Sequence, residues 1–279
     1  MRFKSLFLLG LVLLLGIRPA AGADKPLVFG VFPNLTAKQI VEVYRPMAKV
    51  LEKQLNRRID IYSARDFKTF VARTRQGEYD LLLTAPHLAW LARQDAGYQP
   101  LLKYAQPVRG LLVVKAESAF SELPELRGNT LAMADPLAVV VLSMQAELEA
   151  RGLKRNVDYH SLNAGSHMNA LMQVINGRAD AAVLGMQPFT LAPPEVRKQL
   201  RVLAETPPLS SQMYLTHPRL RDAEVNAIRK ALLAFAATPE GKAFMQRGGY
   251  GSFVKIDGNE LRAFRPYAIQ ASEILQAAQ

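Results

Sequence analysis

The chain has 279 residues, of which 49% are hydrophobic, with 17 Gly, 17 Pro and no Cys. This composition is typical of a globular protein long enough for one large domain or two lobes, and the lack of Cys excludes disulfides and a cysteine nucleophile. The net charge of +11 at pH 7 is spread along the sequence without a run of five or six like charges or a basic-aromatic motif, so we expect no nucleic-acid partner.

The first 23 residues are typical of a cleaved signal peptide. Arg2 and Lys4 form a basic start, an apolar run follows from Leu6 to Ile17, and Ala21-Gly22-Ala23 fits the small-x-small cleavage rule. The apolar run is too short for a comfortable membrane span. We therefore expect a protein exported to a periplasm, whose mature chain begins at Asp24.

Strand-like and helix-like segments alternate through the mature chain. Apolar or alternating runs predict strands over 27–32, 58–63, 79–84, 100–105, 110–115, 130–134, near 159, over 180–184 and 210–216, and once more between 193 and 208. Helical stripes lie between most of them, and Pro46 inside the first stripe predicts a break or kink. After residue 216 the chain is expected to be mostly helical. The alternation predicts an α/β fold with largely parallel sheets.

One strand and the helix after it are of particular interest. The apolar run from Thr130 to Ala134 ends at Asp135-Pro136, and the helical pattern continues to about Gly152. Asp135 suits the N-cap and Pro136 the first helical position. A helix that begins at the end of a strand leaves unpaired N–H groups that can bind a ligand. A well-capped βα unit without a ligand explains the same residues.

An internal repeat favours two lobes over one continuous sheet. Gly77-Glu78-Tyr79-Asp80 and Gly177-Arg178-Ala179-Asp180 each follow an amphipathic helix and precede an apolar strand, and the two aspartates are 100 residues apart. We expect lobe 1 to comprise residues 24–107 and 209–279, and lobe 2 residues 108–208.

The order and spacing of five motifs carry a resemblance to a known family. Asp66-Phe67, Gly-x-x-Asp80, Asp135-Pro136, Ala164-Gly165-Ser166-His167 and Gly-x-x-Asp180 follow one another as in the type II periplasmic solute-binding proteins of the phosphonate/phosphite-binding (PhnD-like) family. The chain is similar to this family from Leu27 to about Gly249. The resemblance implies two α/β lobes with two crossing segments, a small-molecule ligand in the cleft between them, and delivery of that ligand to an ABC permease.

A sensory role is the alternative that the same scaffold allows. The closed protein would then present its ligand to a membrane-bound sensor kinase. We expect a monomer without a cofactor in either case. The four His have no metal-ligand spacing, and no nucleophile or phosphate-loop motif predicts an enzyme.

Three positions depart from the family's ligand site. Where phosphonate binders carry Ser-Thr-Ser-Gly after the Asp-Pro, this chain has Ala138-Val139-Val140-Val141, so every hydroxyl is missing. An aromatic residue of the family corresponds to Thr84, and a carboxylate that holds an amine corresponds to Gln187. These departures predict a ligand of lower charge than a phosphonate, such as a monoanion with an apolar or aromatic body.

Fourteen residues are expected to contact the ligand. Three of them have equally simple structural explanations: His167 as an exposed residue beside a capping Ser166, His87 as a solvent-facing residue of a first helical turn, and Ser211 as part of a polar loop. The expected contacts are Phe67, Thr84, Pro86, His87, Asp135, Leu137, Ala138, Val139, Val140, Ser166, His167, Gln187, Ser211 and Tyr214.

Overall fold

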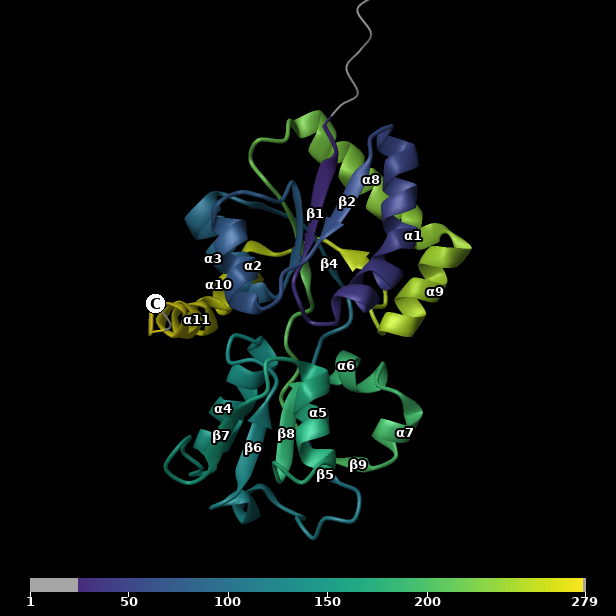
Figure 1. The fold of residues 1–279 in the computed structure, drawn as a ribbon. Helices are drawn as coiled ribbons and strands as arrows, with labels where there is room; N and C mark the ends of the chain where they lie inside the picture. Colours follow the sequence, from purple (N-terminus) through teal and green to yellow (C-terminus); the bar gives the residue numbers. More distant parts are fainter. Residues whose placement is uncertain (1–24, 278–279) are drawn as a thin grey trace, which may run out of the picture.

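The computed structural model describes residues 25–277, which form two units placed end to end in Figure 1. Each unit is built on its own β-sheet, and the chain passes between them twice. We call residues 25–107 and 209–277 the first half and residues 108–208 the second half. The predicted signal peptide and the expected start at Asp24 lie outside the described residues.

The first half contains a six-stranded sheet of order β11-β4-β10-β3-β1-β2. Its strands are β1 (Leu27–Val31), β2 (Ile59–Tyr62), β3 (Leu81–Thr84), β4 (Gln99–Tyr104), β10 (Met213–Thr216) and β11 (Phe253–Val254). Its helices are α1 (Ala37–Leu55), α2 (Phe67–Arg75), α3 (Pro86–Ala96), α8 (Asp222–Ala237), α9 (Pro239–Gly248), α10 (Gly258–Ala263) and α11 (Arg265–Ala277). Helices α1, α8 and α9 gather on one side of this sheet, and α2, α3 and α11 on the other (Figure 1).

The second half contains a five-stranded sheet of order β7-β6-β8-β5-β9. Its strands are β5 (Gly110–Lys115), β6 (Thr130–Met133), β7 (His160–Asn163), β8 (Ala181–Gly185) and β9 (Leu200–Glu205). Its helices are α4 (Val139–Ala150), α5 (His167–Ile175), α6 (Met186–Thr190) and α7 (Pro194–Arg197), with a 3₁₀ turn at Leu123–Leu126. The chain passes between the halves at residues 106–108 and 206–209, which we call the crossing segments. Val108 and Leu209 form an isolated antiparallel bridge where these two segments meet.

The α/β class is confirmed, but the sheets are mixed and not largely parallel. Helical connections make β1, β2 and β3 parallel in the first sheet and β6, β7 and β8 parallel in the second. Strands β5 and β10 enter their sheets directly from the other half, and both run antiparallel to their neighbours. The apolar runs predict strands but not their direction. Direction depends on how successive strands are connected, because parallel neighbours require a long crossover connection and antiparallel ones do not.

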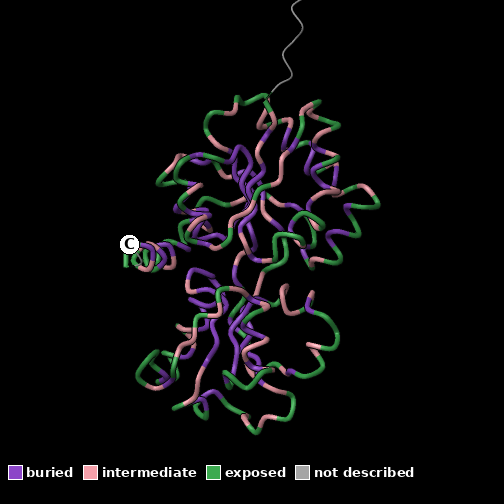
Figure 2. The backbone as a smooth tube through the Cα atoms, viewed as in Figure 1, coloured by how far each residue is buried: buried purple, intermediate pink, exposed green. Residues whose placement is uncertain are grey.

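Burial explains why the two inner strands are continuous apolar runs. The four residues of β3 and the five of β8 are all buried, since helices cover both faces of each sheet. Figure 2 shows this buried backbone at the centre of each half, surrounded by exposed helices and loops. In the described part of the chain, no helix is long and apolar enough to cross a membrane.

Three local predictions need correction. Helix α4 begins at Val139 and not at Pro136, because the Asp135 side chain accepts a hydrogen bond from Leu137 N (2.8 Å) and holds a turn before the helix. Helix α1 continues through Pro46 without a break. Strand β11 lies in the region that was expected to be helical, and pairs with β4 at the sheet edge.

Candidate ligand-binding site

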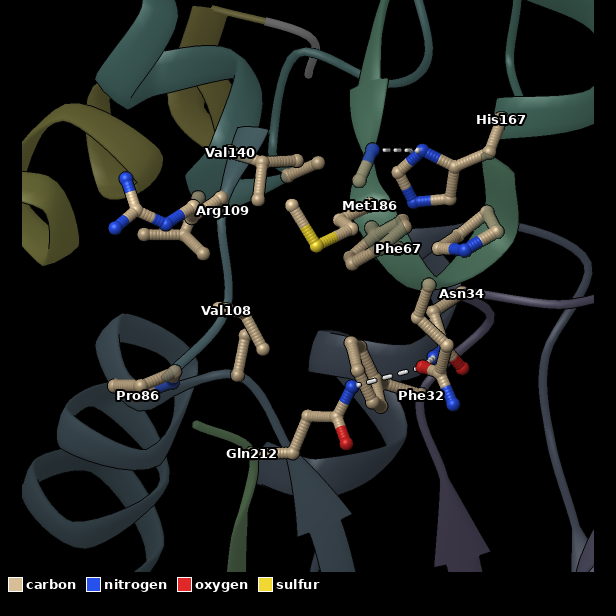
Figure 3. Close-up of a pocket in the computed structure, with 16 residues that line it drawn as sticks. Phe32, Asn34, Phe67, Pro86, Val108, Arg109, Val140, His167, Met186 and Gln212 are labelled. Carbon is tan, nitrogen blue, oxygen red and sulfur yellow. Dashed lines mark hydrogen bonds between the residues drawn. The ribbon is translucent and has the colours of Figure 1, made fainter. Parts of the chain in front are cut away.

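A cavity of about 60 Å³ lies between the halves, close to the crossing segments. Figure 3 shows the side chains that surround it. Most of them follow the ends of strands or begin helices, which is where ligands bind in α/β folds. The lining residues are Phe32, Asn34, Phe67, Ala85, Pro86, Val108, Arg109, Ala138, Val139, Val140, His167, Gly185, Met186, Gln187, Pro188 and Gln212.

The first half supplies an aromatic wall. Phe32 follows β1, and Phe67 begins α2, whose N-cap Asp66 accepts a hydrogen bond from Thr69 N. The two rings meet edge to face with centroids 6.0 Å apart. Across the cavity, Met186 and Val140 come from the second half (Figure 3). The cavity is therefore apolar on both of these sides.

The second half presents the N-terminus of α4 to the cavity. Ala138 occupies the N-cap position without a side-chain cap, and its carbonyl accepts bonds from Val141 N (2.9 Å) and Leu142 N (3.1 Å). The N–H groups of Val139 and Val140 have no partner among the residues that the structure describes. Because α4 is a twelve-residue helix, these free donors lie at the positive end of its dipole.

A glycine brings α4 close to the crossing segment. Gly110 begins β5, and a Cβ atom there would lie 2.8 Å from Val140 O and 2.9 Å from Thr206 Cγ2. Its N–H donates to Thr206 Oγ1 (2.9 Å). The first turn of α4 can therefore pack directly on the backbone where the chain enters the second half.

His167 supplies a neutral donor. Its Nδ1 accepts a hydrogen bond from Gly185 N (3.3 Å), so the proton of the neutral ring is on Nε2. Figure 3 shows this second nitrogen directed toward Met186. Burial lowers the pKa of His167 to about 4, because a buried imidazolium loses its hydration. At neutral pH His167 therefore offers an N–H group and no charge.

The aliphatic part of the Arg109 side chain lines the cavity, whereas its guanidinium points away from it. The guanidinium donates to Thr206 O (3.3 Å) and lies 3.8 Å from Glu205 Oε2. Figure 3 shows it at the edge of the cluster, on the side away from His167. The cavity thus has no side-chain hydroxyl in its lining and no cation directed into it.

Three side-chain amides meet at one end of the cavity. Asn34 Nδ2 and Gln212 Nε2 both donate to Gln187 Oε1, at 3.4 and 3.2 Å, and Gln187 Nε2 donates to the hydroxyl of Tyr250. Asn34 and Gln212 belong to the first half and are 5% and 7% exposed. Gln187 belongs to the second half, so this cluster joins the two.

A larger outer chamber of about 230 Å³ adjoins the cavity. The two share Asn34, His167 and Pro188. The chamber is bordered by the capped N-termini of α1 and α5 and by Arg65, which pairs with Asp66 (3.1 Å).

The structure brings half of the fourteen predicted residues to the cavity. Ser166 lines only the outer chamber, where its hydroxyl caps α5 by accepting from Asn169 N (3.1 Å). Contact of any of these residues with a ligand stays a prediction. The seven at the cavity are Phe67, Pro86, Ala138, Val139, Val140, His167 and Gln187.

The remaining six predicted residues lie outside the cavity lining. Thr84 and Tyr214 are fully buried in the first sheet, and the Tyr214 hydroxyl bonds that of Tyr104 (2.5 Å). Ser211, 1% exposed, is buried beside the crossing segment. Thr84 and Tyr214 point into packed regions because strand periodicity places alternate residues on opposite faces, which the sequence pattern did not resolve. Ser211 precedes β10 and is not part of a strand.

His87, Leu137 and Asp135 form a separate contact between the halves. His87 is fully buried and not solvent-facing, and its Nε2 bonds Leu137 O (2.8 Å). Burial lowers the pKa of His87 to about 4, so Nε2 is a neutral donor. Burial raises the pKa of Asp135 to about 6, with a smaller contribution from the charge of Asp66. Both groups hold Leu137, which places the turn before α4.

Sequence reasoning missed the lining residues that follow β1 and those at the crossings. Phe32 and Asn34 follow β1 as Asp135 follows β6, but the repeat carried no residue pattern that marked them. Gln212 lies in the polar stretch before β10 that was considered at the cleft, although it was not among the fourteen, and no local pattern marks Arg109. In the described part of the chain, no group of three or more His, Asp and Glu side chains could hold a metal ion.

Comparisons with known proteins decide the family. A family model described as "ABC transporter, phosphonate, periplasmic substrate-binding protein" matches residues 29–261. The chain belongs to this family. Its members are substrate-binding proteins of transporters, which implies a periplasmic location and an ABC transporter as partner. Nothing in the family description supports the sensory alternative.

Individual relatives agree with this assignment. The chain is 23% identical to the phosphonates-binding periplasmic protein of Escherichia coli, over 96% of this chain and 82% of that one. A binding protein component of an ABC phosphonate transporter from Pseudomonas aeruginosa superposes with a TM-score of 0.79 at 18% identity, covering 90% and 89% of the two chains. PhnD1 from Prochlorococcus marinus, solved with methylphosphonate, gives 0.81 at 15% identity, covering 89% and 99%. These structures confirm the two-lobed fold.

Proposed function

We propose that this periplasmic binding protein captures a small solute with one negative charge, or a neutral acceptor group, joined to an apolar body. The carrying observation is the cavity lining, in which neutral donors, apolar side chains and the amides of Asn34 and Gln212 occur without a hydroxyl or an inward cation among the described residues. The charged or acceptor end would meet Val139 N, Val140 N and His167 Nε2. The apolar end would meet Phe32 and Phe67.

The electrostatics disfavour a phosphonate dianion. Burying a dianion requires many donors, and each hydrogen bond to a charged group is worth roughly 1.5–3 kcal/mol. Replacing the family's hydroxyls by Ala138, Val139 and Val140 removes two or three such bonds. Two losses weaken binding by about a hundredfold or more, because about 1.4 kcal/mol is tenfold. The helix dipole adds only about 0.3–1 kcal/mol and cannot replace them.

Ligand capture would use a hinge. The halves are joined by two short segments that meet at Val108 and Leu209, and the cavity lies between the halves beside them. We propose that lobe 1 (24–107 and 209–279) and lobe 2 (108–208) close around the solute and that an ABC permease accepts the closed form. Small-angle scattering should show a smaller radius of gyration at ligand saturation. An unchanged radius would count against the hinge.

The ligand class is tested by a thermal-shift screen of the mature protein. The library should contain matched compounds that carry the same apolar or aromatic group, one with a monoanionic head group and the other with a phosphonate. The expected result is stabilisation by one of the monoanions or neutral acceptors and none by its phosphonate partner. A phosphonate that stabilises more than its matched monoanion would overturn the proposal.

Export would proceed through the predicted signal peptide, with cleavage after Ala23. N-terminal sequencing of the protein from a periplasmic fraction should read Asp24 first. A product that still begins with Met1 would contradict this proposal.

A further inference from the structure

The amide of Gln187 makes three hydrogen bonds from the second half to the first. Its Oε1 accepts from Asn34 Nδ2 (3.4 Å) and Gln212 Nε2 (3.2 Å), and its Nε2 donates to the Tyr250 hydroxyl. A carbonyl oxygen has two lone pairs, so both acceptor sites of Gln187 are occupied by protein groups. A ligand ammonium would therefore find neither a charge nor a free acceptor on this side chain.

The partners of Gln187 are already ordered within the first half. The Tyr250 ring stacks on Tyr104, with centroids 3.9 Å apart and planes 14° apart, and its hydroxyl lies 3.4 Å from that of Tyr44. Tyr44, Tyr104 and Tyr250 are each at most 3% exposed. Because this surface is buried and its rings are stacked within the first half, Gln187 can bond it without reordering the first half.

The position of Gln187 makes these bonds sensitive to closure. The residue lies in α6, directly after β8, and lines both the cavity and a second pocket of about 210 Å³ between α1, α6 and α9. Its side chain thus stands between the two spaces, where the halves face each other. Separating the halves would break all three bonds, whereas bonds inside either half would survive.

We propose that Gln187 is a latch that stabilises the closed form in the absence of ligand and so sets the open–closed ratio of the protein. This inference rests on the proposed hinge. Both partners of each latch bond belong to this chain, so the closed form needs no solute to complete these bonds. Gln187 acts here as a positioning residue that determines how the cavity is assembled, and the ligand's own contacts are made by other residues.

Fluorescence energy transfer between two cysteines tests the latch directly in the ligand-free protein. The natural chain has no Cys, so Glu240→Cys in α9 and Glu195→Cys in α7, both at exposed positions on different halves, can be labelled without background. Gln187→Leu keeps the size of the side chain and removes its hydrogen bonds. Tyr250→Phe removes one latch bond, together with the 3.4 Å contact to the Tyr44 hydroxyl within the first half, and keeps the stacked ring. Gln173→Leu, in α5, makes the same substitution on the second half without touching the latch.

The ligand-free protein with Gln187 intact should show both an open and a closed population, so that ligand binding can still lower the radius of gyration. Gln187→Leu should lower its closed-to-open ratio by about tenfold or more, which corresponds to about 1.4 kcal/mol. Tyr250→Phe should lower the ratio by a smaller factor, and Gln173→Leu should leave it unchanged. Because Tyr250→Phe preserves packing, it reports on the latch even if Gln187→Leu does not fold.

Two contrary outcomes separate the latch from the hinge. If the protein exchanges between open and closed forms but neither latch variant alters the ratio, the latch is wrong and the hinge stands. If every variant shows one fixed distance, and that distance is also unchanged by any solute that stabilises the protein in the thermal-shift screen, the hinge itself is wrong and the proposed function fails with it.

Discussion

The two halves repeat one scaffold and differ where the cavity is built. In each, a capped helix ends at a glycine of positive φ, Gly77 (69°) or Gly177 (68°), and an aspartate then receives a backbone N–H from the neighbouring strand. Asp80 accepts from Val28 N at 2.7 Å and Asp180 from Thr130 N at 2.8 Å. The conserved geometry of the repeat supports the sheets, and the residues that differ supply the chemistry.

Two pairs of equivalent positions show the difference. Phe67 begins α2, whereas His167 begins α5 and offers an N–H group. Thr36 caps α1 in a capping box with Gln39, whereas Ala138 leaves the N-terminus of α4 uncapped. At the cavity the second half therefore keeps free donors, whereas the first half supplies aromatic rings and the amides of Asn34 and Gln212, whose side-chain oxygens have no partner among the described residues.

The largest loss of stability is expected when an aspartate of the repeat is replaced. Asp80→Ala removes a carboxylate that also pairs with Arg219 Nε (2.6 Å) and should lower the free energy of unfolding by about 2–3 kcal/mol, because it breaks charge-assisted hydrogen bonds to the partly buried donors of Val28 and Arg219. Asp180→Ala, at an exposed position, should cost only about 0.5–1.5 kcal/mol. Urea denaturation measures both. Equal losses would show that the two turns are energetically equivalent, contrary to this account.

His167, which occupies in the second half the position of Phe67 in the first, should make the stability of the protein depend on pH. The pKa of His167 is lowered to about 4 in the folded protein, so the unfolded chain binds more protons between pH 4 and about 6.5. Stability should therefore rise with pH across this window, by at most about 3 kcal/mol for one such group. His167→Phe removes this contribution and should flatten the slope, measured by urea denaturation at pH 4.5 and 7.

Two neighbouring groups sharpen the pH test. His87→Gln should remove a similar share of the slope, because the pKa of His87 is also lowered to about 4. Asp135 acts in the opposite direction, since its pKa is raised to about 6 and its contribution to stability is lost as the pH rises through that value. Asp135→Asn should steepen the slope. A slope that none of the three substitutions alters would contradict these assignments.

The smallest expected effect is at the helix caps. Thr36→Ala should destabilise the ligand-free protein by about 1 kcal/mol, and Ala138→Thr should stabilise it by a similar or smaller amount. Each corresponds to a shift of about 2–4 °C in the melting temperature. Differential scanning calorimetry can resolve both. A Thr36→Ala variant that melts with the parent protein would show that the capping box contributes nothing.

The repeat shows which features of the fold could be predicted from the sequence. Gly77-x-x-Asp80 and Gly177-x-x-Asp180 are local patterns, and they correctly predicted a helix, a turn and a buried strand in each half. Strand direction in β5 and β10 depends on how the chain crosses between the halves, which no local pattern encodes. His87 was expected to contact the ligand or to face solvent. Its burial against Leu137 was not predicted, because Leu137 belongs to the other half.

The candidate site was harder to predict because its residues meet across the halves. Ala138, Val139 and Val140 were recognised from one motif in the second half. Asn34 and Gln212 come from distant segments of the first half and meet only through Gln187. A single sequence gives no signal for such a meeting point.

Isothermal titration of methylphosphonate tests the central claim most directly. The protein with its natural α4 N-terminus should be compared with a triple variant, Ala138→Ser, Val139→Thr and Val140→Ser, which restores hydroxyls beside the free N–H groups. The account predicts no submicromolar binding to the unsubstituted protein and an affinity for the triple variant that is higher by about tenfold or more. Submicromolar binding of methylphosphonate by the unsubstituted protein would contradict the claim that its hydroxyl-free cavity selects a less highly charged solute.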